Sequence, residues 1–128
     1  EDALSALDWA QRVGGLEGLI GRSRANLGAI EAWVEKTGWV EFLAQRPSER
    51  CSTSICLTLV PSGLSPEDQA STAKAMVKLL AEEEVAYDIG SYRDAPPGLR
   101  IWGGATVDSA DLEALTLWLD WAYDEVAA

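Results

Sequence analysis

Two arginines, Arg93 and Arg100, lie on either side of a conformationally restricted turn in an otherwise acidic chain. The turn holds two consecutive prolines, Pro96 and Pro97, whose rings fix φ at about −65° and favour extended geometry in the residue before each. Gly98 follows them and can adopt positive φ. Each guanidinium can hold a carboxylate or a phosphate through two parallel hydrogen bonds. Two such groups across a stiff turn predict a binding site for a small ligand with two anionic groups.

A structural role is the alternative for both arginines. Asp88 and Asp94 lie near them in the sequence and are available as partners for ion pairs. Structural ion pairs outnumber ligand sites in folded proteins, so composition alone favours this second interpretation. The residues by themselves leave both interpretations open.

The composition indicates one globular domain with a substantial core. The chain has 128 residues, of which 48% are hydrophobic. When a chain of this length folds, it buries roughly two-thirds of the surface that the unfolded chain exposes. Ten basic and 21 acidic residues give a net charge of −11, which disfavours nucleic acid and anionic membranes as partners. No apolar run approaches the length of a membrane span, and no secretory signal opens the chain.

The two cysteines and the lack of histidine limit the available chemistry. Cys51 and Cys56 are five residues apart in an expected strand, so their side chains should lie on opposite faces, where neither a disulfide nor a shared metal fits. We expect buried or half-buried free thiols, as in a reducing cytoplasm. Because the chain has no histidine, a hydrolase built on a Ser-His or Cys-His pair is excluded within it.

The periodicity of apolar residues predicts an α+β fold, with a small, mainly antiparallel sheet covered by helices. Helices are expected over 2–13, 16–37 and 65–84, and from 108 to near the C-terminus, with Gly14 and Gly15 interrupting the first two. Strands are expected over 50–60, 85–90 and 99–102, with a short extended segment at 39–44. Alternation along the first of these strands predicts that the face with Ile55, Leu57 and Leu59 is buried. Ser65 is the expected N-cap of its helix, with Pro66 in the first turn.

Two of the helices carry informative apolar patterns. The second should bury a stripe that consists of Leu16, Leu19, Ile20, Leu27, Ile30 and Val34. Trp118, Trp121 and Tyr123 widen the apolar face of the last helix, which predicts a second packing surface for a missing domain or a partner chain. The chain begins without Met and enters a helix at once, so we expect a fragment of a longer protein.

The run from Ala86 to Trp102 resembles the C-terminal part of the phosphoserine aminotransferase family, in its bacterial branch. Three further segments resemble the same family in the same order. They are Gly14–Leu16 followed by Arg22–Asn26, then Ser52–Leu57, and finally Trp118–Ala122.

The resemblance implies a piece of a pyridoxal-phosphate-dependent enzyme of the aspartate-aminotransferase fold type. Residues 1–13 would end an interdomain helix and 14–128 would form the small C-terminal domain, with the large cofactor-binding domain outside this chain. The family is a cytoplasmic homodimer of serine biosynthesis. It exchanges an amino group between phosphoserine plus 2-oxoglutarate and 3-phosphohydroxypyruvate plus glutamate.

The resemblance also implies roles for individual residues. Arg100 matches the arginine that clamps the substrate carboxylate, and Arg93 matches the arginine used for the substrate phosphate. Tyr92 stands where many relatives have histidine; its hydroxyl can donate to phosphate, although packing is the expected role. The turn over 94–98 is one residue longer than the commoner form. Lys36, Lys74 and Lys78 lie outside the family's cofactor-lysine context, so we expect no catalytic, cofactor-binding or metal-binding residue here and no activity from this chain alone.

Two other functions remain open on the sequence. A non-enzymatic ligand-sensing α+β module would use the same arginines for a dicarboxylate or phosphate. An interaction domain would instead bind its partner through the tryptophans of the last helix.

Overall fold

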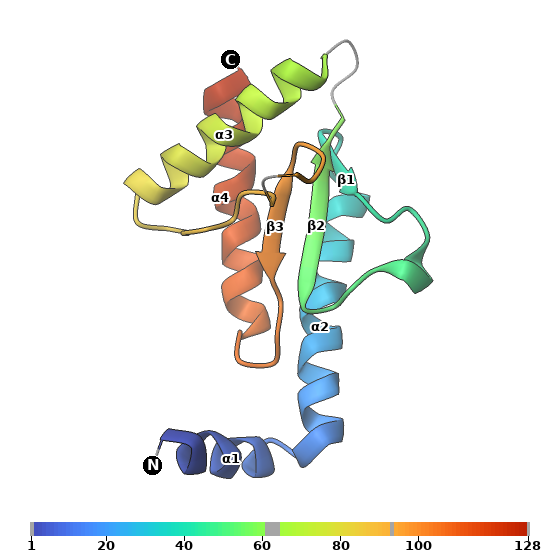
Figure 1. Ribbon diagram of the computed structural model, residues 1–128, viewed down its shortest axis with the longest axis vertical. Helices are drawn as coiled ribbons and strands as arrows, with labels where there is room; N and C mark the ends of the chain where they lie inside the picture. The colour runs from blue at the N-terminus through green and yellow to red at the C-terminus, as the bar shows by residue number, and fades with distance from the viewer. Residues whose placement is uncertain (1, 61–64, 93, 128) are drawn as a thin grey trace.

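A computed structural model describes residues 2–60, 65–92 and 94–127, so Arg93 lies outside the described residues. The described chain forms a three-stranded antiparallel sheet, in the order β1-β2-β3, with helices packed against it (Figure 1). In chain order the elements are α1 (Asp2–Arg12), α2 (Gly15–Glu35), β1 (Val40–Phe42), the 3₁₀ turn η1 (Pro47–Glu49), β2 (Ser54–Leu59), α3 (Pro66–Glu82), β3 (Leu99–Trp102) and α4 (Ser109–Ala127). This architecture confirms the expected α+β class.

The local signals at the helix ends work as expected. Gly14 and Gly15 have φ of 111° and 67°, a left-handed conformation that glycine adopts without penalty, and they separate α1 from α2. The side chain of Ser65 accepts a hydrogen bond from the backbone N–H of Asp68 at 3.1 Å, which caps α3. The predicted break and the predicted cap are therefore confirmed.

The sheet presents one apolar face to the helices. Ile55, Leu57 and Leu59 of β2 are buried, as predicted, while the alternate residues are half-buried. The core lies between this face and α2, α3 and α4. Its members from the helices include Ile30 and Trp33 of α2, Met76 and Leu80 of α3, and Leu112 and Leu119 of α4. Figure 1 shows α2 and α4 running along the strands, with α3 crossing α4.

Two predicted strands need correction. Residues 85–90 contain no strand, only a single bridge between Gly90 and Leu99, because Asp88 adopts a positive φ of 57° that breaks the extended run. The strand predicted over 50–60 begins only at Ser54. Cys51 therefore lies before β2 and is exposed, contrary to the expected burial, whereas Cys56 is half-buried as expected.

The apolar stripe predicted for α2 holds only in its second half. Ile30 is buried, and Leu27 and Val34 pack against the core, but Leu16 is exposed on the first half of the helix. There the side chains that the structure buries are polar. Asn26 is fully buried and donates to the carbonyls of Gly103, Gly104 and Val107 at 2.9–3.1 Å, which anchors the loop after β3.

Apolar side chains are also exposed at both ends of the described chain. α1 has no buried residue, and Leu4 and Leu7 point to solvent. On α4, Leu117 and Trp118 are exposed, whereas Tyr123 stacks on Trp39 with centroids 4.4 Å apart and belongs to the core. Among the described residues no helix combines the length and apolar character that crossing a membrane would require.

Candidate functional site

Arg100 lies in β3, the edge strand that follows the proline turn. It faces Cys56 of β2 in the register of the sheet. Its backbone N–H donates to the carbonyl of Ile89 at 2.8 Å, and Gly90 bridges Leu99. The segment before the turn therefore runs beside β3 even though it is not a strand, and it brings its side chains close to Arg100.

Gly98 positions the turn by close approach to β2. A Cβ atom at this position would overlap the carbonyl of Leu57, so only glycine fits. The φ of Gly98 is not positive, so its close approach to β2, and not the positive φ expected from the sequence, explains the glycine. On the other side of the turn, the N–H of Ala95 donates to the carbonyl of Tyr92 at 3.0 Å. Because Gly98 immediately precedes β3, its contact with β2 sets the position at which Arg100 enters the sheet.

The guanidinium of Arg100 has two neighbours from the preceding segment. Its Cζ lies 4.3 Å from the ring centroid of Tyr92, in cation–π geometry. Its Nη2 lies 3.7 Å from Oδ2 of Asp88, an ion pair longer than a hydrogen bond. The Arg100 side chain is 16% exposed, whereas that of Asp88 is 93% exposed. Asp88 is therefore a loose, solvated partner for a largely buried cation.

The Nε atom of Arg100 is buried and has no hydrogen-bond acceptor among the described residues. Leaving a buried donor unsatisfied costs about 1–3 kcal/mol, and more for a charged group. Native proteins pair almost all such atoms, so an orphaned one indicates a missing acceptor. A carboxylate that met the guanidinium along its Nε edge would satisfy it.

A cavity of about 400 Å³ lies beside Arg100. Its walls come from residues 86–89, from β3 and from Leu112 and Leu115 of α4. Most of these side chains are apolar, with Arg100 and Asp88 as the charged groups. Such a cavity can hold a small molecule whose anionic group meets the arginine.

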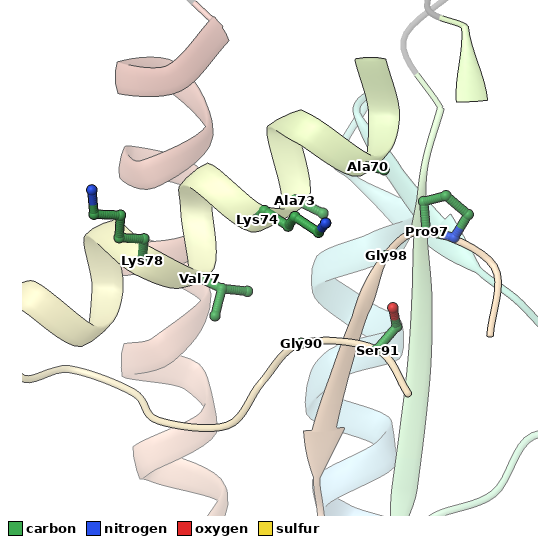
Figure 2. Close-up of a pocket in the computed structure, with 9 residues that line it drawn as sticks. All are labelled: Ala70, Ala73, Lys74, Val77, Lys78, Gly90, Ser91, Pro97 and Gly98. Atoms are coloured by element: carbon green, nitrogen blue, oxygen red, sulfur yellow. The ribbon is translucent and has the colours of Figure 1, made fainter. Parts of the chain in front are cut away.

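A second cavity, of about 270 Å³, lies on the other side of the turn, between α3 and residues 90, 91, 97 and 98 (Figure 2). Small and apolar residues line most of it, and Lys74 and Lys78 of α3 stand at its border. Figure 2 shows the amino group of Lys74 directed towards Pro97 and that of Lys78 directed away. Both lysines are exposed, and Lys78 lies 3.9 Å from Glu82.

The structure brings two of the three predicted site residues together. Tyr92 and Arg100 are in direct contact, while Arg93 lies outside the described residues. The structural alternative is also partly realised, because Asp88 does pair with Arg100, although loosely. The contact between the ring of Tyr92 and the guanidinium of Arg100 was not predicted from the sequence. Its signal was a tyrosine and an arginine flanking a turn whose prolines reverse the chain.

The exposed thiol of Cys51 lies outside this site. The backbone N–H of Ser54 and the hydroxyl of Thr53 hydrogen-bond to its sulfur and lower its pKa from the ordinary 9.0. Together with Cys56 it lines a cavity of about 240 Å³ next to Arg50. Within the described residues, no group of three or more cysteine or carboxylate side chains is placed to hold a metal ion.

The chain is similar to phosphoserine aminotransferases in sequence. It is 52% identical over 126 residues to that of Methanosarcina mazei and 51% identical over 126 residues to that of Methanosarcina barkeri; each match covers 98% of this chain and 32% of the relative. It is 31% identical over 121 residues to that of a Nocardioides species, covering 94% and 30%. The chain therefore spans about a third of the length of these relatives. No protein-family profile matches it.

The fold of the chain is also similar to that of a solved phosphoserine aminotransferase. The phosphoserine aminotransferase of Bacillus circulans subsp. alkalophilus superimposes with a TM-score of 0.71 at 20% identity, over 92% of this chain and 30% of that one. At this identity the likeness establishes the fold, and the Methanosarcina sequences establish the relationship. Sequence and fold together make the chain a homologue of the C-terminal part of phosphoserine aminotransferases.

Proposed function

We propose that this chain is the small C-terminal domain of a pyridoxal-phosphate-dependent phosphoserine aminotransferase. The enzyme exchanges an amino group between phosphoserine plus 2-oxoglutarate and 3-phosphohydroxypyruvate plus glutamate, in serine biosynthesis. Support comes from 52% identity along 98% of the chain to a phosphoserine aminotransferase. In this proposal residues 1–13 end an interdomain helix and 14–128 form the small domain of a cytoplasmic homodimer.

The residues of this chain do not fit the cofactor. Pyridoxal phosphate requires a lysine that forms a Schiff base and an acidic or basic partner for its ring nitrogen. The chain has three lysines, Lys36, Lys74 and Lys78, and all are exposed on or at the ends of helices. The cavity that two of them border is lined by no acidic residue. The cofactor and its lysine therefore belong to the remaining two-thirds of the enzyme, and the chemistry of the amino transfer takes place there.

The role of this domain is to hold the substrate. Arg100 binds the α-carboxylate of the amino acid, and the observation that carries this assignment is its buried Nε without an acceptor beside an apolar cavity. A bidentate contact fixes the carboxylate in two directions, so the Cα–H bond keeps one orientation relative to the rest of the active site. The loosely held Asp88 leaves the guanidinium available to the substrate.

Arg93 is assigned to the phosphate of phosphoserine, on the resemblance of the segment 86–102 to the family. A site built to pair a phosphate discriminates strongly against substrates without one, since its buried cation is then left unpaired.

The test is a transamination assay on the polypeptide encoded by the whole gene, with phosphoserine and 2-oxoglutarate as substrates. We expect glutamate formation that depends on pyridoxal phosphate. Arg93→Ala should weaken the reaction with phosphoserine and spare the half-reaction with glutamate. An equal loss with both substrates would contradict the phosphate role of Arg93. A gene product with no cofactor-binding domain would contradict the assignment of the chain to a phosphoserine aminotransferase.

A non-enzymatic module that binds a small dianion is the second candidate. It is favoured by the fact that Arg100 and its cavity are formed entirely within this chain. Such a module would bind glutamate or phosphoserine without amino transfer, so calorimetric binding in the absence of transamination would select it.

A further inference from the structure

Tyr92 contacts Arg100 through its aromatic ring. The centroid lies 4.3 Å from Cζ, which places the guanidinium over the ring face. The ring is 62% exposed and stands at the start of the proline turn, so it adds little to the core. Among the described residues, its main contact is therefore with Arg100 and not with the core.

The polar neighbours of Arg100 do not fix the plane of its guanidinium. Among the described residues Nε has no acceptor, and the oxygen of Asp88 lies 3.7 Å from Nη2, beyond hydrogen-bond distance. A planar fork recognises a carboxylate only when its plane is aligned with the ligand. Among the described contacts, the ring of Tyr92, centred 4.3 Å from Cζ, is the one placed to restrict the orientation of the guanidinium.

We propose that Tyr92 is a positioning residue for Arg100, whose guanidinium it holds by stacking so that the fork meets the substrate carboxylate in plane. This inference rests on the proposed function, because the ligand of Arg100 is taken to be an amino-acid carboxylate. In this proposal Tyr92 acts through its aromatic ring, and the effect is on binding of the substrate carboxylate. A hydroxyl donating to the phosphate would give a different pattern of effects.

The physical basis is the freedom that an arginine loses on binding. A long side chain that must be immobilised by its ligand weakens the affinity, whereas one that is already held does not. Stacking on an aromatic ring restricts the guanidinium plane while it leaves the edge nitrogens free for hydrogen bonds. Removal of the ring should therefore raise KM for every substrate with an α-carboxylate, whether or not it carries phosphate.

The test compares two variants of the full-length enzyme. Tyr92→Leu removes the ring, and we expect KM for both glutamate and phosphoserine to rise about fivefold, the scale of one cation–π contact, with kcat within about twofold. Tyr92→Phe keeps the ring and removes only the hydroxyl, so it should behave as the parent enzyme. A Tyr92→Phe enzyme as impaired as Tyr92→Leu, or impaired with phosphoserine alone, would overturn the proposal in favour of the hydroxyl.

A double-mutant cycle separates action through Arg100 from a general structural effect. In an Arg100→Met background, Tyr92→Leu should change kcat/KM by less than about twofold, because there is no guanidinium left to position. If Tyr92→Leu has its full effect there too, or none in the parent enzyme, the positioning role is wrong. Failure of the proposed function is recognised separately, as no transamination by the parent enzyme or normal turnover by Arg100→Met alone.

Discussion

Arg50 and Arg100 occupy similar surroundings in two different parts of the molecule. Their side chains are 17% and 16% exposed. Each guanidinium lies over an aromatic ring, that of Phe42 at 3.9 Å and that of Tyr92 at 4.3 Å. Each also has one carboxylate neighbour. By burial, stacking and charge alone, the two arginines would be given the same role.

They differ in their hydrogen-bond acceptors. Arg50 donates from Nε to the carbonyl of Ala44 at 3.0 Å, from Nη2 to the carbonyl of Gln45 at 3.2 Å and from Nη1 to Glu31 at 3.0 Å. Arg100 has a buried Nε without an acceptor and an ion pair at 3.7 Å. Arg50 is thus satisfied by the protein, whereas Arg100 is left with unused donors.

Hydrogen-bond satisfaction, and not burial, is the observed difference between these two arginines. Arg50 ties the loop between β1 and β2 to α2, so its contribution is to stability. Arg100 has no acceptor for its Nε among the described residues and lies beside a cavity, and we propose that its contribution is to binding. The following variants of the full-length enzyme test this division.

The largest effect is expected from Arg100→Ala. It should lower kcat/KM by about two to three orders of magnitude, because a charged bidentate contact to the substrate is lost. The thermal midpoint and the absorption of the bound cofactor should stay near those of the parent. Steady-state kinetics and a visible spectrum measure both, and normal turnover would remove Arg100 from the site.

Arg50→Ala should show the opposite pattern. Removal of three hydrogen bonds, one of them to a carboxylate, should destabilise the protein by about 2–4 kcal/mol and leave the carbonyls of Ala44 and Gln45 without their donor. The enzyme that remains folded should keep kcat/KM within about threefold. Thermal unfolding and steady-state kinetics on the same sample measure both quantities. Loss of activity without loss of stability in Arg50→Ala would contradict the structural role of Arg50.

A smaller effect is expected from Asp88→Asn. If the Asp88 carboxylate competes with the substrate for Arg100, its neutralisation should lower KM by about twofold to threefold, the scale of an exposed ion pair. Glu84→Gln is the matched control, since Glu84 is also exposed and also has positive φ, 58° against 57°. A higher KM in Asp88→Asn would mean that Asp88 holds the arginine for the substrate instead of competing with it.

The smallest effect concerns the thiol beside Arg50. The N–H of Ser54 and the hydroxyl of Thr53 stabilise the Cys51 thiolate and lower its pKa below 9.0, so its alkylation below that pH should be faster than in the unfolded chain. The advantage should vanish as the pH rises above the ordinary thiol pKa, where both states are thiolate. Arg50→Ala should reduce it by loosening the loop. Iodoacetamide labelling of a Cys56→Ser variant across pH measures the rate, and equal rates for the folded and unfolded chains would show that the donors have no effect.

Much of the fold follows from local rules that act within a few residues. Gly14 and Gly15 separate two helices because only they adopt left-handed φ at no cost, and Ser65 starts α3 because its hydroxyl meets a nearby N–H. The alternation along β2 predicted its buried face because successive side chains in a strand point to opposite sides. The family resemblance also came from the sequence, and the Methanosarcina relatives confirm it.

Local rules failed where the partner of a residue is distant in the sequence. The first half of α2 was expected to bury Leu16 and Ile20, but it buries Asn26, whose acceptors lie some 80 residues later. The strand expected at 85–90 is absent because Asp88 adopts a positive φ of 57°, and the segment meets β3 through a single bridge, from Gly90 to Leu99. Periodicity cannot detect either effect, since it reads only neighbours along the chain.

The amino-acid sequence predicts two arginines on either side of a stiff turn, in a helix-covered antiparallel domain that resembles part of one enzyme family. It does not reveal which arginines find hydrogen-bond acceptors within the folded protein. That depends on carbonyls and carboxylates brought from other elements: Arg50 meets Glu31 of α2, while Arg100 contacts the ring of Tyr92 and has no acceptor for its Nε among the described residues. The number of acceptors around a buried donor is a property of the folded chain, and it is what distinguishes the arginine proposed to bind substrate from the structural one.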